Sequence, residues 1–262
     1  MKERPPVFSK LKEYYRYRRG WNKLTSDRSR LDGCKNLGDD LKFYSQFIRK
    51  GSVCFDVGAN VGDKTELFLQ LGATVVAVEP QQSCQRILRR RFGNNKNVYI
   101  EACALAEIKG KTTLFIDKSK TLASISQDWI STVKRSGRFS SHKWSDKLSV
   151  AAVSLDDLIE KYGKPGFCKI DVEGAELEVL RGLSSQIDVV SFEFVSERAT
   201  RSLDCIDYLA ELGKAEFNYC LGSSLHFALP DWSGPAEFKV ILNKMSLHLE
   251  NYGDIYVRFT RV

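Results

Sequence analysis

The sequence predicts an α/β domain with a seven-stranded, mostly parallel sheet and helices on both faces. Short apolar runs alternate with segments of helical periodicity along the chain, which is typical of βαβ units. The first run, residues 53–55, leads through a glycine turn into the helix-like segment 63–69. A strand, a glycine turn and a helix start form a geometry in which backbone N–H groups meet a ligand.

The glycine turn predicts which kind of ligand binds. Gly58 and Gly62 let the backbone bend sharply, but Asn60 replaces the middle glycine that a dinucleotide site needs. Glu79 follows the second apolar run, 21 residues after Gly58, where an acid can bind both hydroxyls of a ribose. A ligand with a ribose but no pyrophosphate fits this pattern, and S-adenosylmethionine is the common one. The alternative is a plain crossover whose glycines only make a tight turn.

The other elements follow from periodicity and turn residues. Ser154 and Asp157 predict a capping box that starts a short helix ending at Tyr162. Glu173 is expected at the start of a further helix, where its charge meets the positive end of the dipole. The remaining strands are expected at 74–78, 97–102, 167–170, 188–194, 215–221 and 254–259, additional strands at 111–116 and 148–153, and the remaining helices at 39–50, 82–92, 200–213 and 235–245.

A second motif identifies a family. Residues 167–183 read FCKIDVEGAELEVLRGL, and with FDVGAN, the Val-Glu-Pro at 78–80 and the Ser-Leu-Asp-Asp at 154–157 they resemble the FkbM family of methyltransferases. The resemblance covers about residues 50–195 and implies a class I methyltransferase fold with a Rossmann-like sheet. It also implies S-adenosylmethionine-dependent O-methylation, often of sugar or natural-product hydroxyls. An RNA methyltransferase and a non-catalytic binding module with the same fold are the alternatives.

The expected cofactor residues come from the spacing and from the resemblance. Asp56 and Asn60 should order the glycine turn and the amino acid end of the cofactor, and Glu79 should bind the ribose. The resemblance puts adenine beside residues 102–104 and the methyl group beside Asp171. The expected set is Asp56, Gly58, Ala59, Asn60, Gly62, Glu79, Pro80, Ala102, Cys103, Ala104 and Asp171.

Four carboxylates are expected at one edge of the sheet, since Asp56, Glu79, Asp171 and Glu193 lie at or near strand ends. A sugar hydroxyl is a weak acid and needs a base or a metal. Either Asp171 or Glu193 acts as the base, or the two hold a divalent cation such as Mg²⁺. His226 is a third candidate base, although a lone histidine near a strand end is more often structural.

The positive charge is concentrated at the start of the chain. Residues 1–30 contain ten Lys/Arg and three acids, an excess of seven that equals the net charge of the 262-residue chain. Interleaved aromatic residues suit an acidic partner such as an anionic glycan, a membrane surface or nucleic acid. The alternative is a solvated helix that packs on the domain. We therefore expect a basic aromatic arm at 1–36 and a methyltransferase domain at 37–262, with a lid or insertion at 117–147.

The remaining composition indicates a reducing compartment. The seven cysteines form no C-x-x-C motif, which argues against a zinc site or a disulfide framework. No apolar run is long enough for a transmembrane helix, and the start has no apolar core of a secretory signal. The expected location is the cytoplasm, with a peripheral membrane surface as the alternative.

Overall fold

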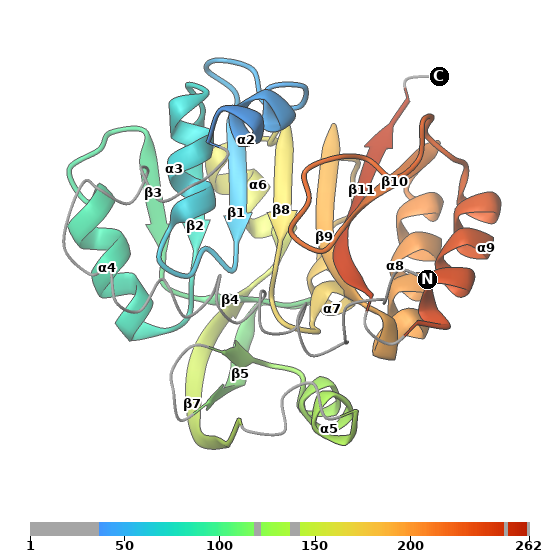
Figure 1. Cartoon of the computed structure of the whole chain (residues 1–262). Helices are drawn as coiled ribbons and strands as arrows, with labels where there is room; N and C mark the ends of the chain where they lie inside the picture. Colours follow the sequence, from blue (N-terminus) through green and yellow to red (C-terminus); the bar gives the residue numbers. More distant parts are fainter. Residues whose placement is uncertain (1–36, 118–121, 137–141, 249–250, 261–262) are drawn as a thin grey trace, which may run out of the picture.

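The computed structural model describes residues 37–117, 122–136, 142–248 and 251–260. A large sheet lies between two layers of helices. A smaller sheet with one helix lies beyond the carboxyl ends of the parallel strands of the large sheet (Figure 1). The helices are α2 (Leu37–Tyr44), α3 (Asp63–Gln70), α4 (Gln82–Phe92), α5 (Gln127–Arg135), α6 (Leu155–Tyr162), α7 (Glu176–Leu180), the 3-10 helix η3 (Ser196–Arg198), α8 (Ala199–Glu211) and α9 (Pro235–Ser246). The strands are β1 (Val53–Val57), β2 (Thr74–Val78), β3 (Val98–Glu101), β4 (Ala104–Leu105), β5 (Gly110–Asp117), β6 (Ala123–Ser124), β7 (Trp144–Val153), β8 (Phe167–Ile170), β9 (Val189–Val195), β10 (Ala215–Leu221) and β11 (Tyr252–Phe259).

The large sheet has the seven strands that the sequence predicts. Its order is β10-β11-β9-β8-β1-β2-β3. The pairs from β9 to β3 are parallel, and β11 runs antiparallel to both of its neighbours. This mostly parallel order, with one reversed strand inserted near an edge, confirms the class I methyltransferase fold.

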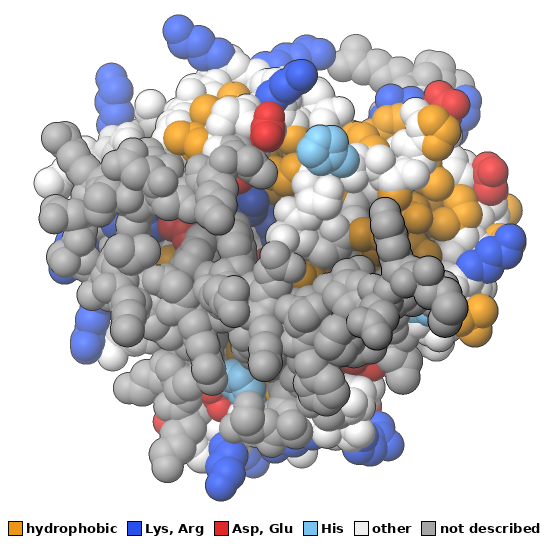
Figure 2. Space-filling view, viewed as in Figure 1, with side chains coloured by type: hydrophobic (Ala, Val, Ile, Leu, Met, Phe, Trp, Pro, Cys, Tyr) orange, Lys and Arg blue, Asp and Glu red, His pale blue; other side chains and the backbone are white. Residues whose placement is uncertain are grey.

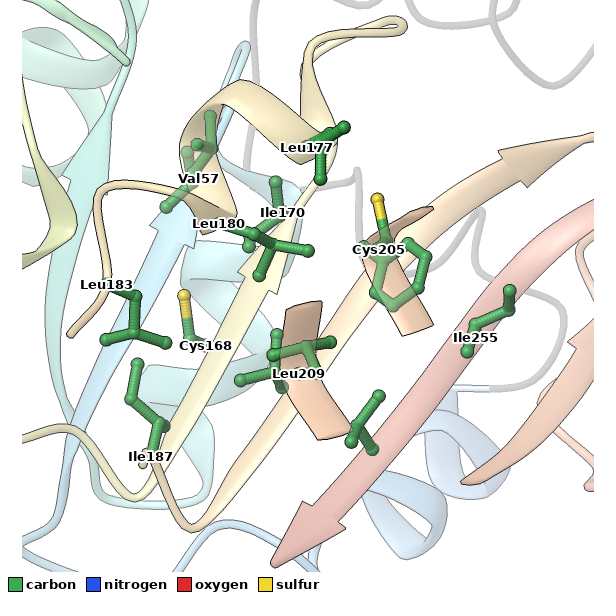
Figure 3. Close-up of a cluster of buried hydrophobic side chains, with 14 of the residues drawn as sticks. Val57, Cys168, Ile170, Leu177, Leu180, Leu183, Ile187, Cys205, Leu209 and Ile255 are labelled. Atoms are coloured by element: carbon green, nitrogen blue, oxygen red, sulfur yellow. The ribbon is translucent and has the colours of Figure 1, made fainter. Parts of the chain in front are cut away.

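Helices cover both faces of this sheet because side chains alternate along each buried strand. On one face, Cys54 and Val75 pack with aromatic residues of α2 and α3, and Ala77 packs against α4. On the other face, Phe55 and Val76 join the main core with α6, α7, α8 and α9. Figure 3 shows part of that core, where Leu177 and Leu180 of α7 meet Ile170 of β8 and Leu209 of α8.

A four-stranded sheet, in the order β4-β7-β5-β6, holds the segment between β3 and α6. The expected strands at 111–116 and 148–153 are therefore present as β5 and β7, which pair antiparallel with each other outside the main sheet. Figure 1 places this sheet and α5 beyond the carboxyl ends of the parallel strands. The described parts of the segment expected as an insertion, 122–136 and 142–147, thus lie beside the edge where a ligand would bind.

Several expectations change or fall outside the described residues. The helix expected at 39–50 ends at Tyr44. The basic arm at 1–36 lies outside the described residues, as do 118–121 and 137–141 of the insertion. The described Lys and Arg side chains visible in Figure 2 are scattered among acidic ones around the outline of the molecule. In the described ranges, every helix is too short or too polar to cross a membrane.

Candidate active site

The glycine turn after β1 adopts a left-handed backbone at three positions. Gly58 has φ +80° and Gly62 has φ +88°, and Asn60 between them has φ 51°. A Cβ on Gly58 would stand 1.9 Å from the main-chain oxygen of Asp171, and one on Gly62 would stand 2.5 Å from the Phe92 ring. Each glycine is therefore required for its conformation and for a close contact. The turn brings β1 against the end of β8.

Glu79 lies directly after β2 and is 3% exposed. One carboxylate oxygen accepts the Asn60 N–H at 2.9 Å, and the other accepts the Gln81 N–H at 2.7 Å. Burial raises the pKa of Glu79 to about 7, although the two backbone donors lower it. The Glu79 carboxylate is held by two uncharged backbone N–H groups at the tip of a strand, where it could accept hydrogen bonds from two ribose hydroxyls. Glu79 and the turn residue Asn60 therefore fit the expected cofactor.

Asp56 serves the start of α3. Its carboxylate, 2% exposed, accepts a 2.6 Å hydrogen bond from the Thr65 hydroxyl. Burial raises its pKa. Arg91 of α4 binds the same helix start, since it pairs with Asp63 at 2.7 Å and Glu66 at 2.6 Å. Asp56 thus anchors the first turn of α3, and its expected roles in ordering the glycine turn and in contacting the cofactor stay predictions.

The expected adenine segment follows β3. Ala102 is exposed, whereas Cys103 and Ala104 are each 5% exposed and pack into apolar clusters. Glu101, at the end of β3, is held by Lys161 and Tyr162 of α6. Burial opposes ionisation of Glu101, but the hydrogen bonds from Lys161 and Tyr162 and the charge of Lys161 together outweigh burial and lower the pKa of Glu101. Of the other expected residues, Ala59 lies on the glycine turn and Pro80 follows Glu79 after β2.

Asp171 ends β8 and lies against the glycine turn. Its main-chain N–H donates to the Val57 carbonyl at 2.9 Å. Its carboxylate pairs at 3.0 Å with Lys169, which also lies 3.8 Å from Asp254 of β11. Burial would lower the pKa of Lys169, but Asp171 and Asp254 raise it well above its usual value. Lys169 is not among the residues expected from the sequence, although a lysine inside an apolar strand is a signal of a functional role.

Glu173 corrects one prediction. It is not at a helix start, because it has φ 57°, Gly174 has φ +92°, and α7 begins only at Glu176. This left-handed turn places the Glu173 carboxylate, in a side chain 6% exposed, beside Asp171 and Glu193. One carboxylate oxygen from each of the three residues lies within 4.8 Å of the others. The structure therefore brings Asp171 and Glu193 together, and adds a third acid.

The insertion packs on this acidic group. Trp129 of α5 is 1% exposed, and a Cβ on Gly174 would stand 2.2 Å from its ring. The Ser124 hydroxyl donates to the Glu173 carbonyl at 2.7 Å. Arg198 of η3, buried at 7% exposure, lies 3.3 Å from Asp128 of the insertion. A pocket between these elements is lined by Trp129, Gly174, Glu176, Leu177, Glu193, Phe194, Val195, Arg198, Arg201, Ser202 and Cys205.

His226 lies elsewhere. It is exposed in the loop after β10, with its Nδ1 3.5 Å from the Ser224 hydroxyl. Its neighbours Leu225 and Phe227 pack against the aromatic cluster that includes Phe43 of α2. Among the described residues, the recorded hydrogen bonds and ion pairs of His226 do not reach Asp171 or Glu193.

Comparisons with known proteins agree with the fold. Residues 56–219 match the model of the FkbM methyltransferase domain. A 62-residue segment is 39% identical to the hexuronic acid methyltransferase AglP of Haloferax volcanii, and the match spans 22% of this chain and 26% of that protein. The chain thus matches about a quarter of that relative's length.

Solved structures with a similar arrangement are distant in sequence. An O-methyltransferase from Bacillus cereus is 12% identical, with a TM-score of 0.43 over 96% of this chain and 91% of that chain. A precorrin-6y C5,15-methyltransferase from Geobacter metallireducens GS-15 is 10% identical, with a TM-score of 0.43 over 86% and 87%. An rRNA methylase from Streptococcus thermophilus is 9% identical, with a TM-score of 0.43 over 87% and 98%. The strand order, rather than these likenesses, defines the fold.

Proposed function

The chain belongs to the FkbM methyltransferase family, and from that premise we propose that it transfers the methyl group of S-adenosylmethionine to a hydroxyl of a sugar or glycan. One observation carries the proposal. The carboxylates of Asp171, Glu173 and Glu193 form one group, and the main chain of Asp171 lies against Gly58 of the glycine turn that would hold the cofactor. An acceptor hydroxyl that reaches this group is placed next to both a base and a methyl donor.

The cofactor would be held by residues at the ends of β1, β2 and β8. Glu79 binds the ribose hydroxyls, and the backbone of Gly58, Ala59 and Asn60 lies against the amino acid end. Residues 102–104 lie beside the adenine. When bound, the cofactor supplies an electrophilic methyl group on its sulfonium. The main task of the chain is then to align the acceptor oxygen and to remove its proton.

Asp171 is the proposed base. Its carboxylate would accept the proton of the acceptor hydroxyl while the methyl group passes from the sulfonium sulfur to the acceptor oxygen, which would leave S-adenosylhomocysteine, and the proton would later pass to solvent. Glu193 is the next candidate and His226 the third.

The proposed acceptor pocket lies between the insertion and α8. Trp129 supplies an aromatic wall, Glu193 a carboxylate and Arg198 a guanidinium, which together suit a polar ring with several hydroxyls. The segment shared with a hexuronic acid methyltransferase also favours a sugar acceptor. The insertion at 117–147 would cover the acceptor as a lid.

A divalent cation such as Mg²⁺ is a second route to the same reaction. Three carboxylate oxygens within 4.8 Å of one another could bind one ion, which would acidify the acceptor hydroxyl. Activity that is lost with a chelator and restored by Mg²⁺ would favour the ion held by Asp171 and Glu193. Activity that persists with a chelator would favour direct proton removal.

The central experiment measures methyl transfer by the wild type and by Asp171→Asn. Asparagine keeps the shape of the side chain but removes the charge, so cofactor affinity should persist while transfer falls by about 10²–10⁴-fold. Labelled cofactor is offered with nucleotide sugars, cell-surface glycans and RNA. Product only with RNA would replace the sugar proposal, and cofactor binding without any product would indicate a binding module. Near-normal turnover of Asp171→Asn would move the base to Glu193 or His226.

The basic arm at 1–36 is proposed as a docking element for an acidic partner, either an anionic glycan, a membrane surface or nucleic acid. A chain that starts at Leu37 should keep its cofactor affinity and lose salt-dependent association with that partner. Failure of the shortened chain to fold would show that the arm is structural. We further propose a cytoplasmic location, which the free, buried thiols of the described cysteines favour.

A further inference from the structure

Lys169 is a charged residue inside an otherwise apolar strand. The β8 sequence reads Phe-Cys-Lys-Ile, and the lysine is 4% exposed in the middle of the sheet. Its cross-strand neighbours are Asp56 on β1 and Ser191 on β9. Burying an ammonium group lowers the stability of the fold by several kcal/mol unless nearby carboxylates neutralise its charge. A neutral apolar residue would pack here with a smaller loss of solvation energy. Packing alone therefore does not explain the lysine at this position.

We propose that Lys169 is a positioning residue for methyl transfer, which holds the Asp171 carboxylate in the orientation that the reaction needs. This inference rests on the proposed role of Asp171. The ammonium lies 3.0 Å from Asp171 Oδ2, and the carboxylate is therefore anchored through its side chain. Its main chain is anchored separately by the Val57 carbonyl and by the contact with Gly58. Two independent anchors leave the Asp171 side chain little freedom to rotate.

The same ammonium connects the acidic edge across strands. Lys169 Nζ lies 3.8 Å from Asp254 Oδ1 on β11, and Asp254 is paired in register with Glu193 on β9. The lysine thus balances charge between β8 and β11, on either side of the strand that carries Glu193. The ammonium of Lys169 thus contacts Asp171, the proposed base, and also Asp254, the cross-strand neighbour of Glu193.

The test compares Lys169→Met with the wild type in the full chain. Methionine keeps most of the volume and removes the charge. Cofactor affinity should stay within about threefold, and kcat should fall by about 10- to 100-fold, since a displacement near 1 Å at a reacting group costs up to about 10²-fold. The acceptor KM should change less than kcat.

Two further variants separate positioning from general support of the fold. Lys169→Met with Asp254→Asn removes one positive and one negative charge, which should restore stability without restoring kcat. Lys169→Met with Asp171→Asn should be no slower than Asp171→Asn alone, because the lysine acts through that carboxylate.

The outcomes distinguish this inference from the proposed function. If Asp171→Asn is slow and folded Lys169→Met keeps its rate, the inference is wrong and the role of Asp171 stands. Recovery of kcat in the variant that also carries Asp254→Asn would show that Lys169 only neutralises a buried charge. Near-normal turnover of Asp171→Asn would overturn both ideas together.

Discussion

Replacing Gly58 by alanine tests whether the glycine turn sets the position of Asp171. Gly51 offers a matched control, because its φ of +81° equals that of Gly58 within a degree, yet a Cβ there would meet nothing within 4 Å. The left-handed backbone should cost roughly 1–2 kcal/mol at either position. Only Gly58→Ala also forces the Asp171 carbonyl away from the new methyl group.

The size of that second effect follows from the contact distance. The carbonyl oxygen stands 1.9 Å from the Cβ position and must retreat to about 3.3 Å, a movement of about 1.4 Å. Overpacking of this kind costs about 1–3 kcal/mol. Gly58→Ala should therefore lower the free energy of unfolding by about 2–5 kcal/mol, against about 1–2 kcal/mol for Gly51→Ala.

Urea unfolding measures the two stabilities, and a transfer assay with labelled cofactor measures the rates. Gly51→Ala should keep its rate. Gly58→Ala should lose about 10²-fold, because the residue beside the methyl group is displaced. Equal loss of stability and equal rates in the two variants would show that the contact with Asp171 is relaxed at no cost, and that the turn does not position this residue.

Other predictions follow from the same site. Glu79→Ala should weaken cofactor binding by roughly 1.5–3 kcal/mol for each ribose bond lost, which calorimetry would detect. Because the pKa of free Glu79 is about 7 and the ionised form is proposed to accept the ribose hydroxyls, the wild-type affinity for the cofactor should be about tenfold lower at pH 6 than at about pH 8, whereas the affinity of Glu79→Gln should depend little on pH. Arg91→Met removes two ion pairs at the start of α3 and should lower the free energy of unfolding, measured in urea, by about 2 kcal/mol. The partial exposure of these pairs keeps the loss below that of a fully buried pair. Gly174→Ala should push Trp129 away and raise the acceptor KM more than the cofactor Kd; a parallel rise in both would contradict the proposed acceptor pocket.

The positions of the expected cofactor residues at the sheet edge could be predicted because their determinants are local in sequence, whereas their contacts with the cofactor stay predictions. Glu79 and Asp171 each follow a buried strand directly, and parallel strands end at the same edge of a sheet. The spacing between Gly58 and Glu79 is set by one helix and two turns. Alternation, capping and glycine positions therefore located these residues before any tertiary contact was known.

The other half depends on contacts that the sequence does not encode locally. Because Glu173 adopts a left-handed backbone, the helix starts later than expected, at Glu176. The side chain of Glu173 does not itself favour that conformation. Arg198 enters the pocket only because the insertion packs against η3. The strands at 111–116 and 148–153 were predicted, but their separate sheet follows from pairing between segments distant in sequence. These are long-range effects, which periodicity cannot report.

The position of β11 has a consequence for the order in which the chain folds. This strand is the last one described, yet it lies between β9 and β10. A nascent chain in which residues 252–259 have not yet been synthesised cannot complete the sheet. The edges of β9 and β10 that pair with β11 then stay unpaired. Asp254 is part of this strand, so the ammonium of Lys169 lacks its second carboxylate until β11 has paired with β9. The acidic edge should therefore be completed in the final folding step, and a chain cut before Tyr252 should aggregate rather than bind cofactor.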